Sequence, residues 1–400
     1  MAVDESYFAK VLGIGRPWKV VSVILDEKEE ETHVTVGTER GSTFPCPECG
    51  RECKIHDFYD REWRSLDLGS SRCIIRAKVP RTDCPEHGVR QIPVPWAREY
   101  SRYSLRFERM CMRMISEMPV DAVARMVRMS DDSLWRIMDF YVEEANRRRD
   151  LSGVKRVGVD ETQCKKGQDY ISVFVDMDTR KVLFATPGRD SDTVKRFVGF
   201  LKEHGGSVDN ITDVSSDMSS AFLSGVAEHI PKAKVTLDRF HVMQLAGEAV
   251  DEVRKSVQKD KKIKLNIKYQ LLKNRKRLSE EEASELDDIL EENMLIASAY
   301  MLKEMLGDLY LLENEAYGRI HLDKWIRMAS AGVHESVKTL AETISLHKEG
   351  ILKWFASKLS NGILEGINSV IQLVKRMARG YRDRSNMINM LYLKCSDLEL

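Results

Sequence analysis

Five short apolar runs in the middle of the chain constrain the fold more than any other sequence feature. Turn residues such as Asp178-Thr179-Arg180 separate the first three runs, and amphipathic helical stretches at 191–204 and 219–229 separate the others. The runs cover residues 154–159, 170–176, 181–187, 211–217 and 234–238. Runs of this length bounded by turn signals are typical of strands. We therefore predict a mixed α/β sheet: three meander strands, then helix, strand, helix and strand.

The segments after this sheet have a helical pattern. Residues 250–355 are highly charged and show no strand signal, so we interpret them as an α-helical insertion. Residues 361–380 are helical again, with Glu365 in the first turn. One apolar side of that helix is predicted to comprise Ile363, Ile367, Val370, Ile371 and Val374. The element order is that of an RNase H-like mixed sheet interrupted by a large α-helical insertion.

Three carboxylates fall where such a sheet brings them together. Asp160 is expected at the end of the first strand, Asp217 at the end of the fourth, and Glu365 on a helix packed against the sheet. Phosphodiester attack needs an activated nucleophile and neutralisation of the leaving oxygen. Two divalent ions about 4 Å apart supply both, and Mg²⁺ or Mn²⁺ prefers carboxylate oxygens. The trio is therefore the candidate catalytic site.

Each carboxylate also has an ordinary structural explanation. Asp160 could be a strand-end turn residue, and Glu365 a first-turn charge favoured by the helix dipole. Three other acids, Asp176, Asp213 and Glu161, lie close to these carboxylates in the sequence. Asp213 is a weaker candidate for catalysis because it is expected in mid-strand, and Asp176 because it follows a different strand.

Two matched knuckles near the N-terminus predict a metal site. Cys46 and Cys49 open the first, CPECG, and Cys84 and His87 form the second, CPEHG. Two intervening residues and a closing glycine allow both ligands of each turn to reach one ion. Four N and S ligands would form a closed, structural Zn²⁺ site. A compact alternative, in which Cys53 and His56 pair with Cys46 and Cys49, is less favoured because the two knuckles are near-copies.

Residues 119–144 have the pattern of a helix-turn-helix. Apolar positions recur on one face of each helix, with Met129-Ser130 at the turn. The second helix of such a motif enters a DNA major groove. Its expected readers are Ser130, Asp132, Ser133 and Arg136. Helical hairpins are common, so the motif alone does not establish DNA binding.

Charge is balanced overall but segregated locally. Lys plus Arg and Asp plus Glu number 63 each. Residues 254–277 contain eleven basic side chains and one acid, whereas residues 280–292 contain eight acids and no base. The basic run could face phosphates, although a solvated helix face is the commoner explanation. The candidate phosphate contacts are Lys259, Lys261, Lys262, Lys264 and Lys268, with Lys375, Arg376, Arg379, Arg382 and Arg384 after Glu365.

The bulk properties limit the class of protein. Four hundred residues exceed one ordinary core, and the apolar runs are too short to span a membrane. The N-terminus lacks the features of a secretory signal, so we expect a cytoplasmic protein. The expected domains are 1–98 (β and zinc-binding), 99–150 (helix-turn-helix), 151–256 (sheet), 257–355 (helical insertion) and 356–400 (the helix with Glu365).

Motifs along nearly the whole chain resemble the bacterial insertion-sequence transposases of the ISL-three family. The matching motifs are CPECG, GVDET, SSDMSSAF, LDRFHV, SNGILEGIN and GYRDRSN. The resemblance implies DDE chemistry by Asp160, Asp217 and Glu365: nicking at element ends, then attack of the freed 3′ hydroxyl on target DNA. It also implies that Asp238 and His241, in a DxxH element, lie near the catalytic pocket, although a capping Asp with a buried His is the plain alternative. His87 departs from the family, where Cys is common at this position.

The resemblance also sets the expected partners. It implies binding to double-stranded DNA at terminal inverted repeats and at a target, near the bacterial nucleoid, by a homodimer or larger assembly. Two other functions remain open: a zinc and helix-turn-helix regulator that binds DNA without cutting it, and an RNase H-like nuclease acting on RNA–DNA hybrids or junctions.

Overall fold

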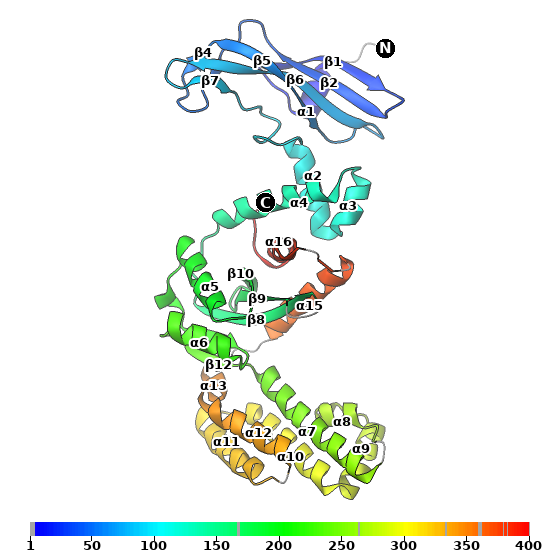
Figure 1. Cartoon of the computed structure of the whole chain (residues 1–400), viewed down its shortest axis with the longest axis vertical. Coiled ribbons are helices and arrows are strands. Elements are labelled where there is room, and N and C mark those ends of the chain that lie inside the picture. The colour runs from blue at the N-terminus through cyan, green and yellow to red at the C-terminus, as the bar shows by residue number, and fades with distance from the viewer. Residues whose placement is uncertain are drawn as a thin grey trace. The chain divides into compact units, whose positions relative to one another are not determined.

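The structure, a computed structural model, describes residues 5–165, 169–262, 265–332, 334–358, 362–378, 380–381 and 383–399 (Figure 1). The chain divides into two compact units, Met1–Met138 and Asp139–Leu400, and each is described separately. None of the helices in the described ranges combines the length and apolar character that a bilayer crossing demands.

The first unit begins with a five-stranded sheet. Its strands are ordered β1-β2-β6-β5, and β7 pairs with the far end of β6. The bounds are α1 Glu5–Leu12, β1 Trp18–Asp26, β2 Glu31–Thr38, β5 Ile55–Arg64, β6 Arg72–Cys84 and β7 Gly88–Gln91. The rings of Trp18 and Trp63 each pack edge-on against Trp96, with centroids 4.9 and 5.4 Å apart. This aromatic cluster anchors the core of the sheet.

Three helices follow the sheet: α2 Leu105–Glu117, α3 Val120–Met126 and α4 Asp131–Arg147, which begins in the first unit and ends in the second. The apolar faces predicted for the helix-turn-helix are buried, from Val120 and Val123 on α3 to Leu134 on α4. Ser130 Oγ accepts the N–H of Ser133 at 3.3 Å, as a helix cap does. The predicted helix, turn and second helix are confirmed.

The second unit is built on a mixed five-stranded sheet of order β10-β9-β8-β11-β12. β9 is antiparallel to both of its neighbours, β8 and β10, whereas β11 is parallel to both β8 and β12. The predicted strands and helices are all present. Their bounds are β8 Arg156–Lys165, β9 Asp169–Asp176, β10 Lys181–Pro187, α5 Asp192–Glu203, β11 Asp213–Ser216, α6 Ser220–His229 and β12 Lys234–Leu237.

Strand β8 differs from the prediction, because it does not end at Asp160. It continues to Lys165, pairing with β9 from Val157 opposite Asp176 to Lys165 opposite Asp169. Its parallel neighbour β11 stops at Ser216. Asp160 therefore lies within the β8–β9 hairpin, at the level where the parallel pairing stops.

The two faces of the sheet are covered by different helices. Val157 and Val159 of β8 belong to one hydrophobic cluster with Phe197 of α5 and Phe222 of α6. A Cβ on Gly158, between them, would lie 3.1 Å from the side chain of Leu364 on α15 (Gly362–Met377). Because successive strand residues alternate between faces, Asp160 shares the face of Gly158 and α15.

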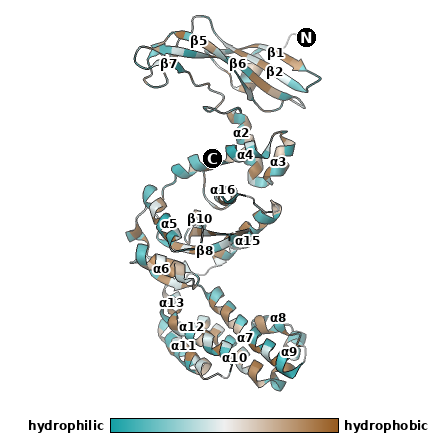
Figure 2. Ribbon diagram, viewed as in Figure 1, coloured by the Kyte–Doolittle hydropathy of each residue, from teal (hydrophilic) through white to brown (hydrophobic). Residues whose placement is uncertain are grey.

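The remainder of the second unit is helical, as predicted (Figure 1). Helices α7 to α12 show hydrophobic and hydrophilic residues side by side in Figure 2, and their buried side chains, Trp325 and Leu306 among them, form one cluster. The bounds are α7 Arg239–Lys261, α8 Lys268–Leu272, α9 Glu280–Glu292, α10 Met294–Asp308, α11 Glu315–Ser330, α12 Glu335–Leu346, α13 Lys348–Leu352, α14 Trp354–Ser357 and α16 Arg384–Cys395.

The apolar face predicted for α15 needs correction. Ile367, Ile371 and Val374 are buried as expected. Ile363 is only half-buried and Val370 is 37% exposed, and Leu364 takes the fourth buried position. Leu364 occupies the gap above Gly158, which turns the buried stripe of the helix away from Val370.

The close approach of α15 to β8 should make Gly158 intolerant of side chains. A Cβ there would lie 2.5 Å from Met177 Sδ, so we expect Gly158→Val to lower the free energy of unfolding by about 1–3 kcal/mol. Gly199 on α5 is the control: it is exposed and has no atom within 4 Å of an added Cβ. Gly199→Ala should raise the unfolding free energy by about 0.5–1 kcal/mol. Urea denaturation measures both, and an unchanged midpoint for Gly158→Val would contradict the close packing.

Candidate active site and metal centre

Three aspartates lie in one row, at the level where the parallel pairing of β8, β11 and β12 stops. Ser215 pairs with Gly158 of β8 and with Thr236 of β12. Two residues further along each strand, the same register sets Asp217 between Asp160 and Asp238. The alternation of strand side chains puts all three on the face covered by α15.

Both carboxylate oxygens of Asp160 accept hydrogen bonds. Oδ1 accepts the N–H of Glu161 at 2.8 Å, and Oδ2 accepts the side-chain amide of Asn368 at 2.6 Å. Burial raises the pKa of Asp160, these two bonds lower it, and the charges of His241 and Asp217 act on it in opposite directions. A carboxylate held this way, with one lone pair left on each oxygen, is chemically suited to a hard cation.

Asp217 follows β11 and opens the turn into α6. Its Oδ1 accepts the N–H of Ser219 at 2.9 Å. Its charge contributes to raising the pKa of both Asp160 and Glu161, so the three carboxylates belong to one electrostatic cluster. A concentration of negative charge of this kind is relieved by a cation.

Asp238 and His241 form a linked pair. Asp238 caps α7 by accepting the N–H of His241 at 3.3 Å, and its Oδ2 lies 2.8 Å from His241 Nδ1. The hydrogen bond to Asp238, with the charges of Asp160 and Asp217, raises the pKa of His241 above its usual value near 6.5. The structural interpretation of Asp238 as a helix cap is therefore confirmed. The imidazole of His241 also interacts electrostatically with Asp160 and Asp217.

Glu365 is exposed, and the structure records no contact between its side chain and this cluster among the described residues. It sits in the first turn of α15, one turn before Asn368, the residue bonded to Asp160. In the described part of the chain, the ligand atoms of Asp160, Asp217 and Glu365 are not gathered within 4.8 Å of one another, as those of the Cys/His group are. The structure thus brings the two aspartates together and brings the helix of Glu365 against them.

Asn368 is the site residue that sequence reasoning missed. It is the last residue of the SNGILEGIN motif, three positions after Glu365, a spacing that puts both on adjoining parts of one helix face. That spacing was the available signal.

The other nearby acids have different surroundings. Asp176 is buried and accepts bonds from the N–H of Asp178 and the hydroxyl of Thr179, as a turn residue does. Asp213 was expected in mid-strand but is the first residue of β11, where it pairs with Arg156, four positions before Asp160 on β8. Glu161 lies 3.7 Å from Arg189. These contacts explain Asp176 and Glu161 without catalysis.

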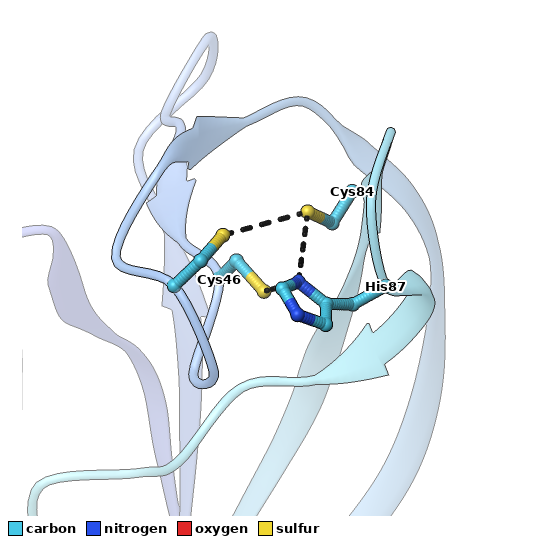
Figure 3. Close-up of side chains that lie close together, drawn as sticks. Cys46, Cys84 and His87 are labelled. Atoms are coloured by element: carbon cyan, nitrogen blue, oxygen red, sulfur yellow. Dashed lines mark hydrogen bonds between the residues drawn. The ribbon is translucent and has the colours of Figure 1, made fainter.

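The four predicted zinc ligands of the first unit come together. The ligand atoms of Cys46, Cys49, Cys84 and His87 all lie within 4.8 Å of one another. Cys49 Sγ is 3.7 Å from Cys84 Sγ, and His87 Nδ1 is 3.6 Å from Cys84 Sγ and 3.8 Å from Cys46 Sγ. Figure 3 shows Cys46, Cys84 and His87 directed toward one point.

These distances fit a zinc ion. Ligand atoms about 2.0–2.3 Å from a tetrahedral Zn²⁺ are roughly 3.4–3.8 Å apart. The backbone N–H groups of Glu86 and His87 lower the pKa of the Cys84 thiol to about 6, which favours the thiolate that zinc requires. On the other side of the imidazole, His87 Nε2 lies 3.7 Å from Glu48, an orienting contact common for zinc-bound histidines.

The compact alternative ligand set is not supported. Cys53 is buried beside Cys46 and Cys84, but its Sγ donates to Arg51 O at 3.3 Å, and it is outside the group of four. His56 pairs instead with Asp57 at 3.5 Å. Cys53 therefore fills the space beneath the knuckles.

The predicted DNA-contacting side chains of the helix-turn-helix fall into two groups. Asp132 and Arg136 are exposed on α4 and free to face a groove. Ser130 and Ser133 share a hydrogen bond of 2.9 Å at the start of the helix, so their hydroxyls already serve the cap.

The lysines and arginines predicted to contact phosphates fall into three groups: those with partners within the chain, those that are exposed, and those outside the described residues. Lys261 donates to Asn293 at 2.5 Å, Lys268 lies 3.9 Å from Asp251, and Arg384 lies 2.5 Å from Asp169. Lys375 donates to Gln163 O on β8. Lys259, Lys262 and Arg376 are exposed, whereas Lys264, Arg379 and Arg382 lie outside the described residues.

Comparison with known proteins gives consistent matches along the chain. A family model described as transposase, of the ISL3 group, matches residues 157–391. The helix-turn-helix domain of transposase family ISL3 matches residues 92–142, and the zinc-finger of transposase IS204/IS1001/IS1096/IS1165 matches residues 42–87.

Two similar proteins carry the same description. The transposase for insertion sequence element IS1001 of Bordetella parapertussis is 29% identical over 349 residues, covering 85% of this chain and 86% of that protein. The transposase for IS1557 of Mycobacterium tuberculosis is 28% identical over 380 residues, covering 87% of this chain and 85% of that protein.

Zinc content distinguishes the two ligand sets. We expect about one Zn²⁺ per chain in the wild-type protein, loss of zinc in Cys84→Ser, and retention in Cys53→Ser, because only the first removes a ligand. Elemental analysis of purified protein measures the ratio. Zinc loss in Cys53→Ser at native stability, with retention in Cys84→Ser, would favour the compact set.

The His241–Asp238 pair should give the protein a pH-dependent stability. Because the folded-state pKa of His241 is raised, the stabilisation is complete below about pH 6.5 and is lost as the pH rises through the folded-state value. The difference in unfolding free energy between wild type and His241→Gln, measured by urea denaturation without Mg²⁺, should therefore shrink between pH 6 and 9. A difference that grows with pH would contradict the ion pair.

Proposed function

Because the chain belongs to the ISL3 family of transposases, we propose that it cuts the ends of an insertion sequence and transfers their 3′ hydroxyls to target DNA at Asp160, Asp217 and Glu365. The proposal rests mainly on one observation: the register of β8 and β11 brings Asp160 and Asp217 side by side on the sheet face that α15 covers.

The fold supports this chemistry. The sheet order β10-β9-β8-β11-β12, in which β9 is antiparallel to its neighbours and β11 and β12 are parallel to β8, supports an RNase H-like core. The helices α7 to α14 are then the insertion between the second aspartate and the glutamate. In such a sheet, the carboxyl ends of neighbouring strands share one edge, which favours a common ion-binding site.

The aspartates are suited to hold divalent ions. Asp160 and Asp217 offer hard oxygen ligands within one electrostatic cluster, and burial around Asp160 limits competition from bulk water. Two bound Mg²⁺ or Mn²⁺ ions would activate the attacking hydroxyl and neutralise the leaving oxygen. The chain's own part is to fix the ligand oxygens before DNA arrives.

Glu365 would complete the ligand set when DNA and ions are present. Its side chain is exposed one turn before Asn368, the residue that contacts Asp160, so a change of side-chain rotamer or a small shift of α15 would bring it toward the aspartates. The negative charge of Asp160 and Asp217 alone disfavours a third carboxylate, and the ions would reverse that repulsion.

His241 would act beside the ions rather than as a ligand. Asp238 holds Nδ1, which fixes the ring and favours its charged form. A cationic imidazole next to the scissile strand would attract a phosphate. In this proposal Asp238 and His241 help to orient the end of the DNA.

The other modules would provide recognition. The zinc site and the exposed Asp132 and Arg136 would read terminal repeats, while exposed lysines and arginines, including Lys262 and Arg376, would give salt-dependent contacts to phosphates. Two ends must be held for joining, so we propose a dimer or larger assembly.

A DNA-binding regulator without nuclease activity is the second candidate, because the zinc and helix-turn-helix modules would serve it equally well. It would bind the same repeats and leave them intact.

Cleavage of terminal-repeat DNA with Mg²⁺ tests the proposal. Loss of an ion-binding carboxylate removes several kcal/mol of charge stabilisation, so Asp217→Asn should cut at least about 1000-fold more slowly than wild type. Asp213→Asn, four positions earlier at the start of β11 and opposite Arg156, is the matched control and should retain near wild-type cleavage.

DNA binding by both variants should remain, since neither residue belongs to the recognition modules. Normal cleavage by Asp217→Asn would refute the site. Binding without cleavage by the wild-type protein, under the full range of Mg²⁺ and Mn²⁺ concentrations, would favour the regulator.

A further inference from the structure

Asn368 joins helix α15 directly to the first aspartate. Its side-chain amide donates to Asp160 Oδ2 at 2.6 Å across 208 positions of sequence. The side chain is half-buried, and it lies on the same face of α15 as the buried Leu364, one turn before it, and the buried Ile371, one turn after it. An asparagine at this depth is a directed polar contact rather than part of an apolar surface.

The bond is one of three contacts that align α15 with β8. Leu364 lies over Gly158, Asn368 bonds Asp160, and Lys375 donates to Gln163 O. From Leu364 to Lys375 the helix rises about 16 Å, and from Gly158 to Gln163 the strand advances about 16 Å. Helix and strand therefore run in the same direction and in step, with the Asn368–Asp160 bond in the middle.

We propose that Asn368 is a positioning residue for metal binding: it fixes the Asp160 carboxylate and holds α15, and hence Glu365, in register with it. The inference rests on the proposed function, since it concerns how Asp160 receives an ion. Asn368 itself is not a ligand. It acts through the oxygen to which its amide donates.

The chemistry of asparagine suits this role. A neutral amide satisfies one lone pair of Oδ2 while leaving the other for a cation, and it adds no charge to compete with the ion. With Oδ1 bonded to the N–H of Glu161, both oxygens of Asp160 have fixed directions. Partners of this kind around a metal ligand typically change metal affinity 10–100-fold when removed.

The same bond couples ion binding to the helix. If α15 in its observed register favours the Asp160 orientation that binds the ion, then the ion must favour that register of α15 by the same factor. Ion binding at the aspartates should therefore slow hydrogen exchange of the α15 backbone, and this effect should depend on Asn368.

Mn²⁺ titration of the zinc-loaded full chain, followed by calorimetry, tests the inference without requiring DNA cleavage. Asn368→Ala should bind Mn²⁺ about 10–100-fold more weakly than wild type. Gln372→Ala is the matched control: Gln372 is exposed on the same helix, one turn further on, and should leave Mn²⁺ affinity unchanged. The part of the Mn²⁺ binding heat that is lost in Asp160→Asn and Asp217→Asn is the part due to the proposed site.

Stability and exchange measurements separate positioning from loss of fold. Urea denaturation establishes which variants are folded, and Asn368→Ser replaces Asn368→Ala if the latter does not fold. In folded variants, Mn²⁺ should protect α15 from hydrogen exchange in wild type and in Gln372→Ala but much less in the Asn368 variant.

The outcomes are distinguishable from failure of the proposed function. Wild-type Mn²⁺ affinity and α15 protection in a folded Asn368 variant would overturn the inference while leaving Asp160 and Asp217 as ligands. Wild-type Mn²⁺ binding unaffected by Asp160→Asn and Asp217→Asn would instead overturn the proposed site itself.

Discussion

Backbone hydrogen bonds between β8, β11 and β12 determine the arrangement on which the rest of the second unit depends. The register that pairs Ser215 with Gly158 and Thr236 brings three aspartates, far apart in sequence, to one edge of the sheet. A shift of one residue would turn every side chain of a strand to the other face. Packing of the opposite face of the sheet against α5 and α6 therefore offsets the electrostatic repulsion between the gathered carboxylates.

Helix α15 depends on the same sheet. Gly158 lets Leu364 approach the strand, and the bond from Asn368 to Asp160 ties the helix to a residue of the carboxylate cluster. Packing energy comes from the apolar stripe, and the polar bond selects the register. The helix that carries Glu365 is thus positioned by contacts on either side of it, with Glu365 itself exposed.

The sequence predicted the order of elements well because apolar runs and turn residues report local structure. The strands of the second sheet, the helix-turn-helix and the four zinc ligands were all predicted from such patterns, and the ligand geometry agrees with them. The predicted end of β8 was wrong because the strand is extended by pairing with β9, and the composition of a strand does not encode its pairing. The predicted burial of Val370 was wrong for a related reason. Which side of α15 is buried depends on Gly158 of β8, which has no side chain and so leaves room for Leu364. Asn368 was missed because its partner, Asp160, lies 208 positions away.

The central claim is that Asp160, Asp217 and Glu365 share a pair of divalent ions when DNA is bound. The most direct test is a structure of the protein with terminal-repeat DNA and Mn²⁺, in which anomalous scattering locates the ions. The account predicts oxygen atoms of all three residues about 2.0–2.3 Å from an ion, with α15 still aligned along β8. Ions held by the two aspartates and other groups, with Glu365 still in solvent, would contradict it.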